Sequence, residues 1–307
     1  MSTNLKTIIA GIELKNPTIL ASGILGVTKA SLKNIINNGA GGTVTKSISY
    51  LPRKGHASPI IVTYEAGMLN AVGYANQGAE SAQEEFNGLG GVIKEPVIAS
   101  IIGQTIDDFK KVWEKLEGCG FSAIEIPLSC PHTPGYGTMG GQHAPEMAEK
   151  ITKAIKAVAK VPVFIKVSPN ENMVAVAKAA EAAGADGITA VNTMGPGMII
   201  DLETKTSVLG FGMGGVSGAA LRPVAVRCVF DLYQAIKIPI IGGGGVASGR
   251  DLIEMMMAGA QAVEIGTAVY DRGMSVFQKI VNEAKAWLEK HNYQNITEVI
   301  GLAHKNN

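Results

Sequence analysis

An apolar strand leads directly into a turn at Ile124-Glu125-Ile126-Pro127-Leu128-Ser129-Cys130-Pro131-His132. A short apolar run bounded by turn residues is typical of a strand that is buried on both faces of a parallel sheet. In wound α/β folds the reactive groups follow the carboxyl ends of such strands. The stretch therefore predicts an α/β fold and places the thiol of Cys130 where chemistry is expected.

Similar apolar runs recur along the chain and alternate with amphipathic segments. The eight predicted strands are 18–22, 42–47, 97–102, 123–128, 163–167, 187–192, 238–242 and 262–266. The helical candidates include 30–37, 105–116, 144–158, 170–182, 218–235, 248–257 and 275–290. This alternation predicts βα units, and eight such units favour a closed (β/α)₈ TIM barrel over an open sheet.

Four segments share a glycine that ends a helix and leads into the next strand: Gly39, Gly120, Gly184 and Gly259. Glycine adopts the left-handed conformation that caps a helix at no steric cost. No Pro/Ser-rich linker interrupts residues 1–307, so we expect a single barrel domain. Residues 8–14 predict a small N-terminal β-hairpin over one end, with inserted loops at the C-terminal face.

Composition limits the class of protein. The chain has 307 residues, of which 46% are hydrophobic and 17% charged, and its mean hydropathy is +0.20. The net charge of +1 makes nucleic acid and anionic membranes poor candidates as partners. The first residues lack the apolar core of a signal peptide and no apolar run is long enough to span a membrane. We therefore expect a cytoplasmic protein.

The three cysteines, Cys119, Cys130 and Cys228, lie far apart and form no CxxC pair. This spacing argues against a zinc site, an iron–sulfur cluster or a disulfide framework, so no metal is predicted. Buried free cysteines are usually inert, which is the interpretation for Cys119 and Cys228. Cys130 differs because residues 133–141 form a polar, Gly-rich segment that suits a lid. His56, His132 and His143 are interpreted as surface or hydrogen-bonding residues, although His132 could serve the thiol as a base.

Two glycine clusters follow the last two predicted strands, at 242–245 and at Gly266-Thr267. Such turns let backbone N–H groups approach a phosphate, while the alternative is tight turn packing alone. Lys46 and Lys166 each end an apolar strand, where a lysine either serves a ligand or extends to solvent. A phosphorylated cofactor with an electron-rich ring explains both lysines and both clusters. Asn70 and Asn192 offer the donors and acceptors that suit a pyrimidine, or else they form turns.

Motifs along nearly the whole chain resemble those of the dihydroorotate dehydrogenase family, in its soluble class 1 branch of archaeal or bacterial type, which uses a cysteine base. The matching segments are Ala21-Ser22-Gly23, Thr45-Lys46-Ser47, Pro52-Arg53-Lys54-Gly55, Met68-Leu69-Asn70-Ala71-Val72-Gly73, Leu128-Ser129-Cys130-Pro131, Ile165-Lys166, Asn192-Thr193, Gly215-Val216-Ser217-Gly218, Gly244-Gly245 and Gly266-Thr267. Together these motifs are highly specific.

The resemblance implies a barrel that binds FMN and oxidises (S)-dihydroorotate to orotate in pyrimidine biosynthesis. Cys130 would be the general base, and the hydride would pass to flavin N5. The implied cofactor-binding residues are Ser22, Gly23, Lys46, Ser47, Ser100, Lys166, Val191, Gly218, Gly244, Gly245, Gly266 and Thr267. The implied substrate-binding residues are Lys46, Asn70, Ala71, Val72, Gly73, Tyr74, Asn192 and Thr193. A homodimer is also implied.

The chain departs from the family pattern at three positions. Pro127 and Ser100 stand where the family usually has asparagines that face the flavin, and His132 stands where many members have a substrate-binding asparagine. The Cys-Pro-His turn also resembles dihydropyrimidine dehydrogenase, so reduction of uracil or thymine is an alternative, as is a flavin-binding paralogue without turnover. The electron acceptor stays open between fumarate and NAD reached through a separate iron–sulfur and FAD subunit.

Overall fold

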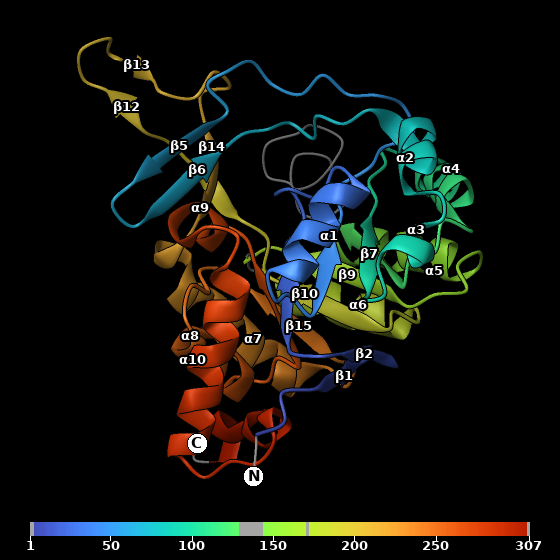
Figure 1. Ribbon diagram of the computed structural model, residues 1–307. Coiled ribbons are helices and arrows are strands. Elements are labelled where there is room, and N and C mark those ends of the chain that lie inside the picture. The colour runs from blue at the N-terminus through green and yellow to red at the C-terminus, as the bar shows by residue number, and fades with distance from the viewer. Residues whose placement is uncertain (1–2, 129–143, 170–171, 306–307) are drawn as a thin grey trace.

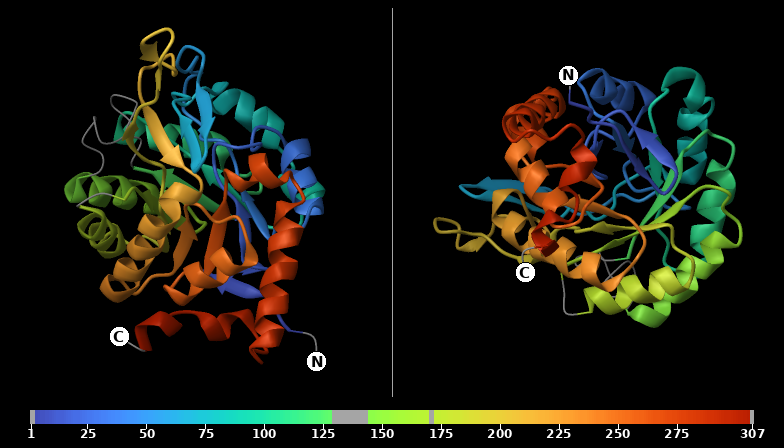
Figure 2. Two further views of the ribbon diagram at one scale, coloured as in Figure 1. Left: turned by 90° about the vertical axis from the view of Figure 1, so that its left-hand side faces the viewer. Right: turned by 90° about the horizontal axis from the view of Figure 1, so that it is seen from below.

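The computed structural model describes residues 3–128, 144–169 and 172–305. Eight parallel strands close into a barrel in the order in which they occur along the chain (Figure 1 and Figure 2). They are β3 (Thr18–Leu20), β4 (Gly42–Val44), β7 (Val97–Ser100), β8 (Ala123–Pro127), β9 (Val163–Val167), β10 (Gly187–Ala190), β15 (Ile240–Gly243) and β16 (Ala262–Ile265). The predicted TIM barrel is therefore confirmed.

Most observed strands end earlier than predicted. The strand predicted at 42–47 ends at Val44, and the strand predicted at 18–22 ends at Leu20. Several residues that follow the strands line a cavity at the mouth of the barrel. Some of them still bond the neighbouring strand, because the N–H of Ala21 donates to the carbonyl oxygen of Ile265 and that of Val191 to the carbonyl oxygen of Gly243. The regular strands are thus shorter than predicted, although some backbone pairing continues toward the mouth.

Helices surround the barrel and cover its outer face (Figure 2). They are α1 (Lys29–Asn37), α4 (Ile106–Leu116), α5 (Pro145–Lys156), α6 (Met173–Ala182), α7 (Arg222–Ala235), α8 (Gly249–Met257) and α10 (Val276–Lys290). Capping boxes begin two of them, because Thr105 and Asp108 exchange hydrogen bonds before α4, as Ser248 and Asp251 do before α8. The four predicted helix-ending glycines all have a positive φ, between 92° and 125°.

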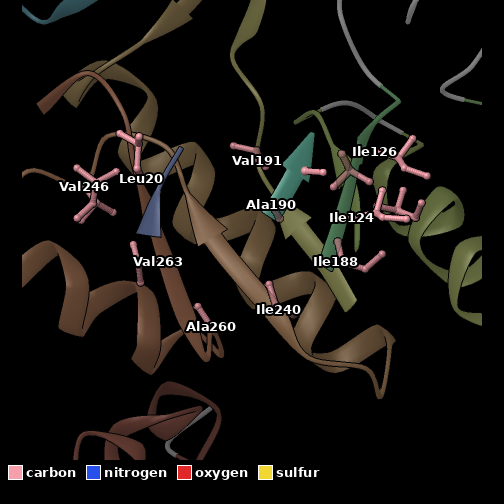
Figure 3. Packing of buried hydrophobic residues seen from close by; sticks show 14 of the residues in the cluster. Leu20, Ile124, Ile126, Ile188, Ala190, Val191, Ile240, Val246, Ala260 and Val263 are labelled. Atoms are coloured by element: carbon pink, nitrogen blue, oxygen red, sulfur yellow. The ribbon is translucent and has the colours of Figure 1, made fainter. Parts of the chain in front are cut away.

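Apolar side chains fill the space between strands and helices. Figure 3 shows Ile124 and Ile126 of β8 pointing outward from the barrel. Both are fully buried and belong to one large cluster that also contains residues of the surrounding helices. A second, smaller cluster fills the barrel interior and includes Ile19, Ile98, Phe164 and Ile241. This explains why the barrel strands are apolar on both faces.

The predicted N-terminal hairpin is present, as β1 (Thr7–Ile9) paired with β2 (Ile12–Leu14). Ile9 and Leu14 pack onto the interior cluster, so the hairpin closes the end of the barrel opposite the mouth (Figure 1).

The packing of Phe164 inside the barrel requires a glycine at position 187 of the neighbouring strand β10, because a Cβ on Gly187 would lie 2.4 Å from Cε1 of Phe164.

An antiparallel sheet at the carboxyl end of the barrel was predicted only as inserted loops (Figure 1). Its strands are β5 (Ile61–Tyr64), β6 (Gly67–Asn70), β11 (Met194–Gly197) and β14 (Gly214–Ser217), in the order β11-β14-β6-β5. A two-stranded hairpin, β12 (Ile200–Asp201) with β13 (Thr206–Ser207), extends from it. The remaining short elements are α2 (Gly78–Phe86), α3 (Leu89–Val92), η2 (Ala219–Leu221), α9 (Ala268–Arg272), η3 (Ile296–Val299) and η4 (Leu302–Lys305).

Candidate active site

A cavity of about 520 Å³ lies at the carboxyl ends of the barrel strands. This volume is in the range of sites that bind small molecules. The inserted sheet contributes Met68, Asn70 and Ser217 to its wall, and residues that follow the barrel strands contribute most of the rest. TIM barrels hold their active sites at this end, so the cavity is the candidate site.

The cavity brings together most of the residues that the resemblance implied. Those that line it are Ser22, Gly23, Lys46, Ser47, Asn70, Val72, Gly73, Tyr74, Lys166, Val191, Asn192, Thr193, Gly218, Gly244, Gly245, Gly266 and Thr267. Ala71 and Ser100 are buried beside the cavity and do not line it. The predicted base Cys130, together with His132 and the predicted lid at 133–141, lies outside the described residues.

The glycine clusters at the ends of β15 and β16 line the cavity together with Gly218, which follows β14. Gly218, Gly244 and Gly245 have φ angles of 84°, 115° and 78°, a region that favours glycine. A Cβ on Gly245 would lie 2.6 Å from the carbonyl oxygen of Gly218. The N–H groups of Gly245, Gly266 and Thr267 donate to no backbone carbonyl within the described residues. Free N–H groups on a surface without side chains suit a phosphate.

Lys46 follows β4 and lines the cavity. Burial lowers the pKa of its ammonium group below the ordinary value of 10.5. In the described part of the chain no carboxylate forms an ion pair with it. A half-buried cation without a protein counter-ion favours an anionic ligand, because the ligand would replace the solvation that burial removes.

Lys166 lies in β9 and meets two carboxylates inside the barrel. Its Nζ lies 2.5 Å from Oε2 of Glu264 and 3.3 Å from Oε1 of Glu125. Burial acts to lower the pKa of Lys166, but attraction by both carboxylates outweighs it and raises the pKa above its usual range. Burial, followed by repulsion from Glu125, raises the pKa of Glu264 well above its ordinary value, although Lys166 opposes this rise.

The two glutamates line the cavity but were missed in the sequence. Both lie in the middle of apolar strands, within Ala123-Ile124-Glu125-Ile126-Pro127 and Ala262-Val263-Glu264-Ile265. The signal was present, because a buried carboxylate needs a partner and Lys166 occupies a similar place in β9.

Hydroxyl groups form a chain along the wall between β3 and β7. Ser22 Oγ donates to the carbonyl oxygen of Thr45 at 2.9 Å and lies 3.3 Å from Ser47 Oγ. Ser47 Oγ lies 2.9 Å from Ser100 Oγ. Ser100 is fully buried and therefore supports Ser47 from behind.

The segment 70–74 that was predicted to hold substrate is supported by two aromatic rings. The rings of His56 and Phe211 stack with centroids 3.9 Å apart. Nδ1 of His56 lies 3.2 Å from the carbonyl oxygen of Ala71, and a Cβ on Gly73 would lie 2.7 Å from Cδ2 of the imidazole. His56 therefore makes hydrogen-bonding contact, as expected of a lone loop histidine.

Cys119 and Cys228 are buried free thiols, as the sequence predicted. Burial raises the pKa of both, and the pKa of Cys228 rises to about 11. Neither residue lines the cavity. Both thiols therefore stay protonated near neutral pH and do not take part in the site.

Comparison with known proteins shows the family of the chain. A family model described as dihydroorotate dehydrogenase matches residues 4–288. Proteins named dihydroorotate dehydrogenase B (NAD(+)), catalytic subunit, are similar over nearly the full length. The one from Methanosarcina acetivorans is 45% identical over 97% of this chain and 95% of its own length. Those from Methanocaldococcus jannaschii and Pyrococcus abyssi are 42% and 44% identical, over 98% and 96% of this chain and 98% and 97% of their own lengths. The predicted resemblance is thus confirmed, and the chain belongs to the dihydroorotate dehydrogenase family.

Proposed function

We propose that this protein uses FMN to oxidise (S)-dihydroorotate to orotate in pyrimidine biosynthesis. Members of its family are flavin-dependent oxidoreductases. The observation that carries the proposal is the meeting of two lysines with the glycine surface in one cavity at the mouth of the barrel. This combination suits a phosphorylated, electron-accepting ring, and both its parts come from strand ends that the family motifs contain.

The donor set fits FMN. The free N–H groups of Gly245, Gly266 and Thr267 would bind the phosphate. Lys46 and Lys166 would lie near the ring, where cations stabilise the negative charge that builds up on reduction. Ser22 and Ser47 offer hydroxyl groups on the same wall.

The chemistry divides between the cofactor and the chain. Bound FMN supplies the hydride acceptor for C6 of dihydroorotate. We assign the removal of the C5 proton to the thiolate of Cys130, so that loss of a proton and a hydride leaves the C5–C6 double bond of orotate. Asn70, Asn192 and Thr193 would orient the pyrimidine, and Lys46 would bind its carboxylate.

Electrons must leave the protein after each turnover. The relatives are named as catalytic subunits of NAD(+)-linked enzymes. By analogy we assign to this chain a separate partner subunit with an iron–sulfur cluster and FAD, which passes the electrons to NAD. We also assign to the chain a homodimer and a place in the cytoplasm. No helix among the described residues is long and apolar enough to cross a membrane.

Anaerobic mixing tests the function directly. The purified protein should be yellow and should release FMN on denaturation. Dihydroorotate should bleach the flavin, whereas dihydrouracil and dihydrothymine should not. Cys130→Ala should keep FMN and slow bleaching by at least about 100-fold, the usual effect of losing a general base. A protein that refuses FMN, or one that dihydroorotate leaves oxidised, would contradict the proposal.

One observation favours a second substrate class. Pro127 lines the cavity where the family usually provides an amide, and proline has no N–H to replace it. A dihydropyrimidine without a carboxylate would lose less binding free energy at such a site than dihydroorotate would. Bleaching by dihydrouracil or dihydrothymine alone would select this alternative.

A further inference from the structure

Three charged side chains meet on the floor of the cavity although their strands lie apart in the barrel. Glu125 is on β8 and Lys166 on its neighbour β9, whereas Glu264 is on β16, on the opposite side of the ring from β8. Closure of the barrel brings Glu264 into contact with Lys166 across 98 residues of sequence. All three line the cavity from below.

The charges of this group do not balance if every side chain is ionised. One ammonium then faces two carboxylates, which leaves one net negative charge. Glu125 is 0% exposed, Glu264 3% and Lys166 5%, so water cannot stabilise the excess charge. An unbalanced buried charge is costly, and two adjacent carboxylates in such a place bind a proton instead.

The hydrogen bonds indicate that one of the two carboxyl groups carries a proton. The ammonium of Lys166 donates to one oxygen of each carboxyl group. The other two oxygens, Glu125 Oε2 and Glu264 Oε1, are buried and have no hydrogen-bond partner among the described residues. Two ionised carboxylates can only accept hydrogen bonds, whereas a protonated one can donate to the other. A hydrogen bond between the two side chains contributes to the raised pKa of Glu264, so a shared proton would give both carboxylates a partner.

We propose that Glu125 and Glu264 share one proton, so that the floor of the cavity carries no net charge, and that this keeps the bound flavin easy to reduce. The second part rests on the proposed function. A net negative charge under the flavin would oppose the arrival of two electrons, and the shared proton removes it. Glu264 is thus a positioning residue that orients the ammonium of Lys166 while it shares the proton with Glu125. Lys46, Tyr74 and Tyr270 are the other titratable residues among those described that line the cavity.

Infrared spectroscopy of the holoprotein tests the shared proton without any substrate. Labelling with ¹³C-glutamate separates glutamate bands from flavin bands. The native protein at neutral pH should show the C=O stretch of a protonated carboxyl group, shifted by the label. Glu264→Gln and Glu125→Gln should each lose this band, because each leaves one carboxylate for one ammonium. Glu149→Gln, on the surface of α5, should keep it. A native protein without the band, or either floor variant that retains it, would overturn the proposal.

The flavin potential, measured by dye-coupled reduction with dithionite, tests the effect on the cofactor. In each single glutamine variant the equilibrium constant for flavin reduction should stay within threefold of the native value, because the net charge of the cavity floor is unchanged. The double variant, with an unbalanced ammonium, should shift it at least tenfold toward reduced flavin, which is about 30 mV for two electrons. A larger shift in either single variant, or none in the double variant, would refute the charge balance. A native protein without the infrared band overturns the proposal even if a variant fails to fold, and neither readout requires that dihydroorotate be the substrate.

Discussion

The hydroxyl oxygens of Ser47 and Ser100 lie 2.9 Å apart, with Ser47 on the cavity wall and Ser100 buried behind it. Ser100 was expected to face the flavin. Its backbone N–H donates to Thr45 Oγ1 at 3.0 Å and its carbonyl oxygen accepts from the N–H of Ile48 at 2.9 Å, so all its polar groups contact the segment that follows β4. Ser100 therefore contacts the cavity wall only through Ser47.

Ser100→Ala should leave the FMN affinity nearly unchanged and lower the free energy of unfolding by about 1 kcal/mol, the usual net value of a buried hydrogen bond. Ser47→Ala removes a hydroxyl from the wall itself and should weaken FMN binding. Fluorescence titration with FMN and urea unfolding of the two variants give both quantities. Equal losses of FMN affinity in the two variants would contradict the assigned arrangement.

Gly245→Ala should weaken FMN binding by about 10- to 100-fold, the equivalent of one charge-assisted hydrogen bond. The new Cβ would lie 2.6 Å from the carbonyl oxygen of Gly218, so this part of the cavity wall must shift. Gly88→Ala is the matched control, because Gly88 also has a positive φ of 70° but has open space around its Cβ position. Similar FMN affinities in the two variants would mean that the surface does not bind the phosphate.

The barrel could be predicted because each of its strands is apolar on both faces and ends in turn residues. The inserted sheet could not, because its strands carry no such pattern. β11 reads Met194-Gly195-Pro196-Gly197 and β14 reads Gly214-Gly215-Val216-Ser217. Backbone hydrogen bonds to β6 and a small cluster of Leu69, Ala71 and Leu209 hold this sheet, and neither feature has a local signature.

The lining of the cavity was predictable where it consists of residues that follow a strand. The lysines and glycines stood out because they interrupt or end apolar runs. Glu264 was missed because its neighbours define a buried strand, and its partner is 98 residues away. Only closure of the barrel brings the two together, and closure is a property of the whole fold.

Orotate binding should weaken as the pH rises through the pKa of Lys46. Burial lowers this pKa below 10.5, so the ammonium loses its proton at a lower pH than an exposed lysine would. Because the neutral amine no longer attracts the orotate carboxylate, the dissociation constant should rise above that pH. Lys46→Met should bind orotate weakly at all pH values and lose this dependence, while Lys33→Met on α1 should keep it. A pH dependence that survives in Lys46→Met would assign it to another group.

Cys119 and Cys228 should be silent toward thiol reagents in the folded protein. With a pKa of about 11, Cys228 is roughly one-thousandth thiolate at pH 8, and only the thiolate reacts. A variant with Cys119→Ser and Cys228→Ser should therefore react with a disulfide reagent at the native rate, while the denatured native protein should reveal all 3 thiols. If the folded native protein showed a reacting phase that is absent from this variant, Cys119 or Cys228 would be accessible to the reagent.

Pro127→Asn should tighten orotate binding by about 3- to 10-fold, the equivalent of roughly one net hydrogen bond. Pro127 lines the cavity and pairs in register with Lys166 on the neighbouring strand, so an amide there would reach the same space as the ligand. Pro127→Ala is the matched control, because it also replaces the proline ring and restores the backbone N–H but adds no side-chain amide. Isothermal titration of both variants with orotate separates the two effects. If Asn and Ala at this position bind orotate equally, the missing amide does not limit affinity, and the proline serves the packing of β8 alone.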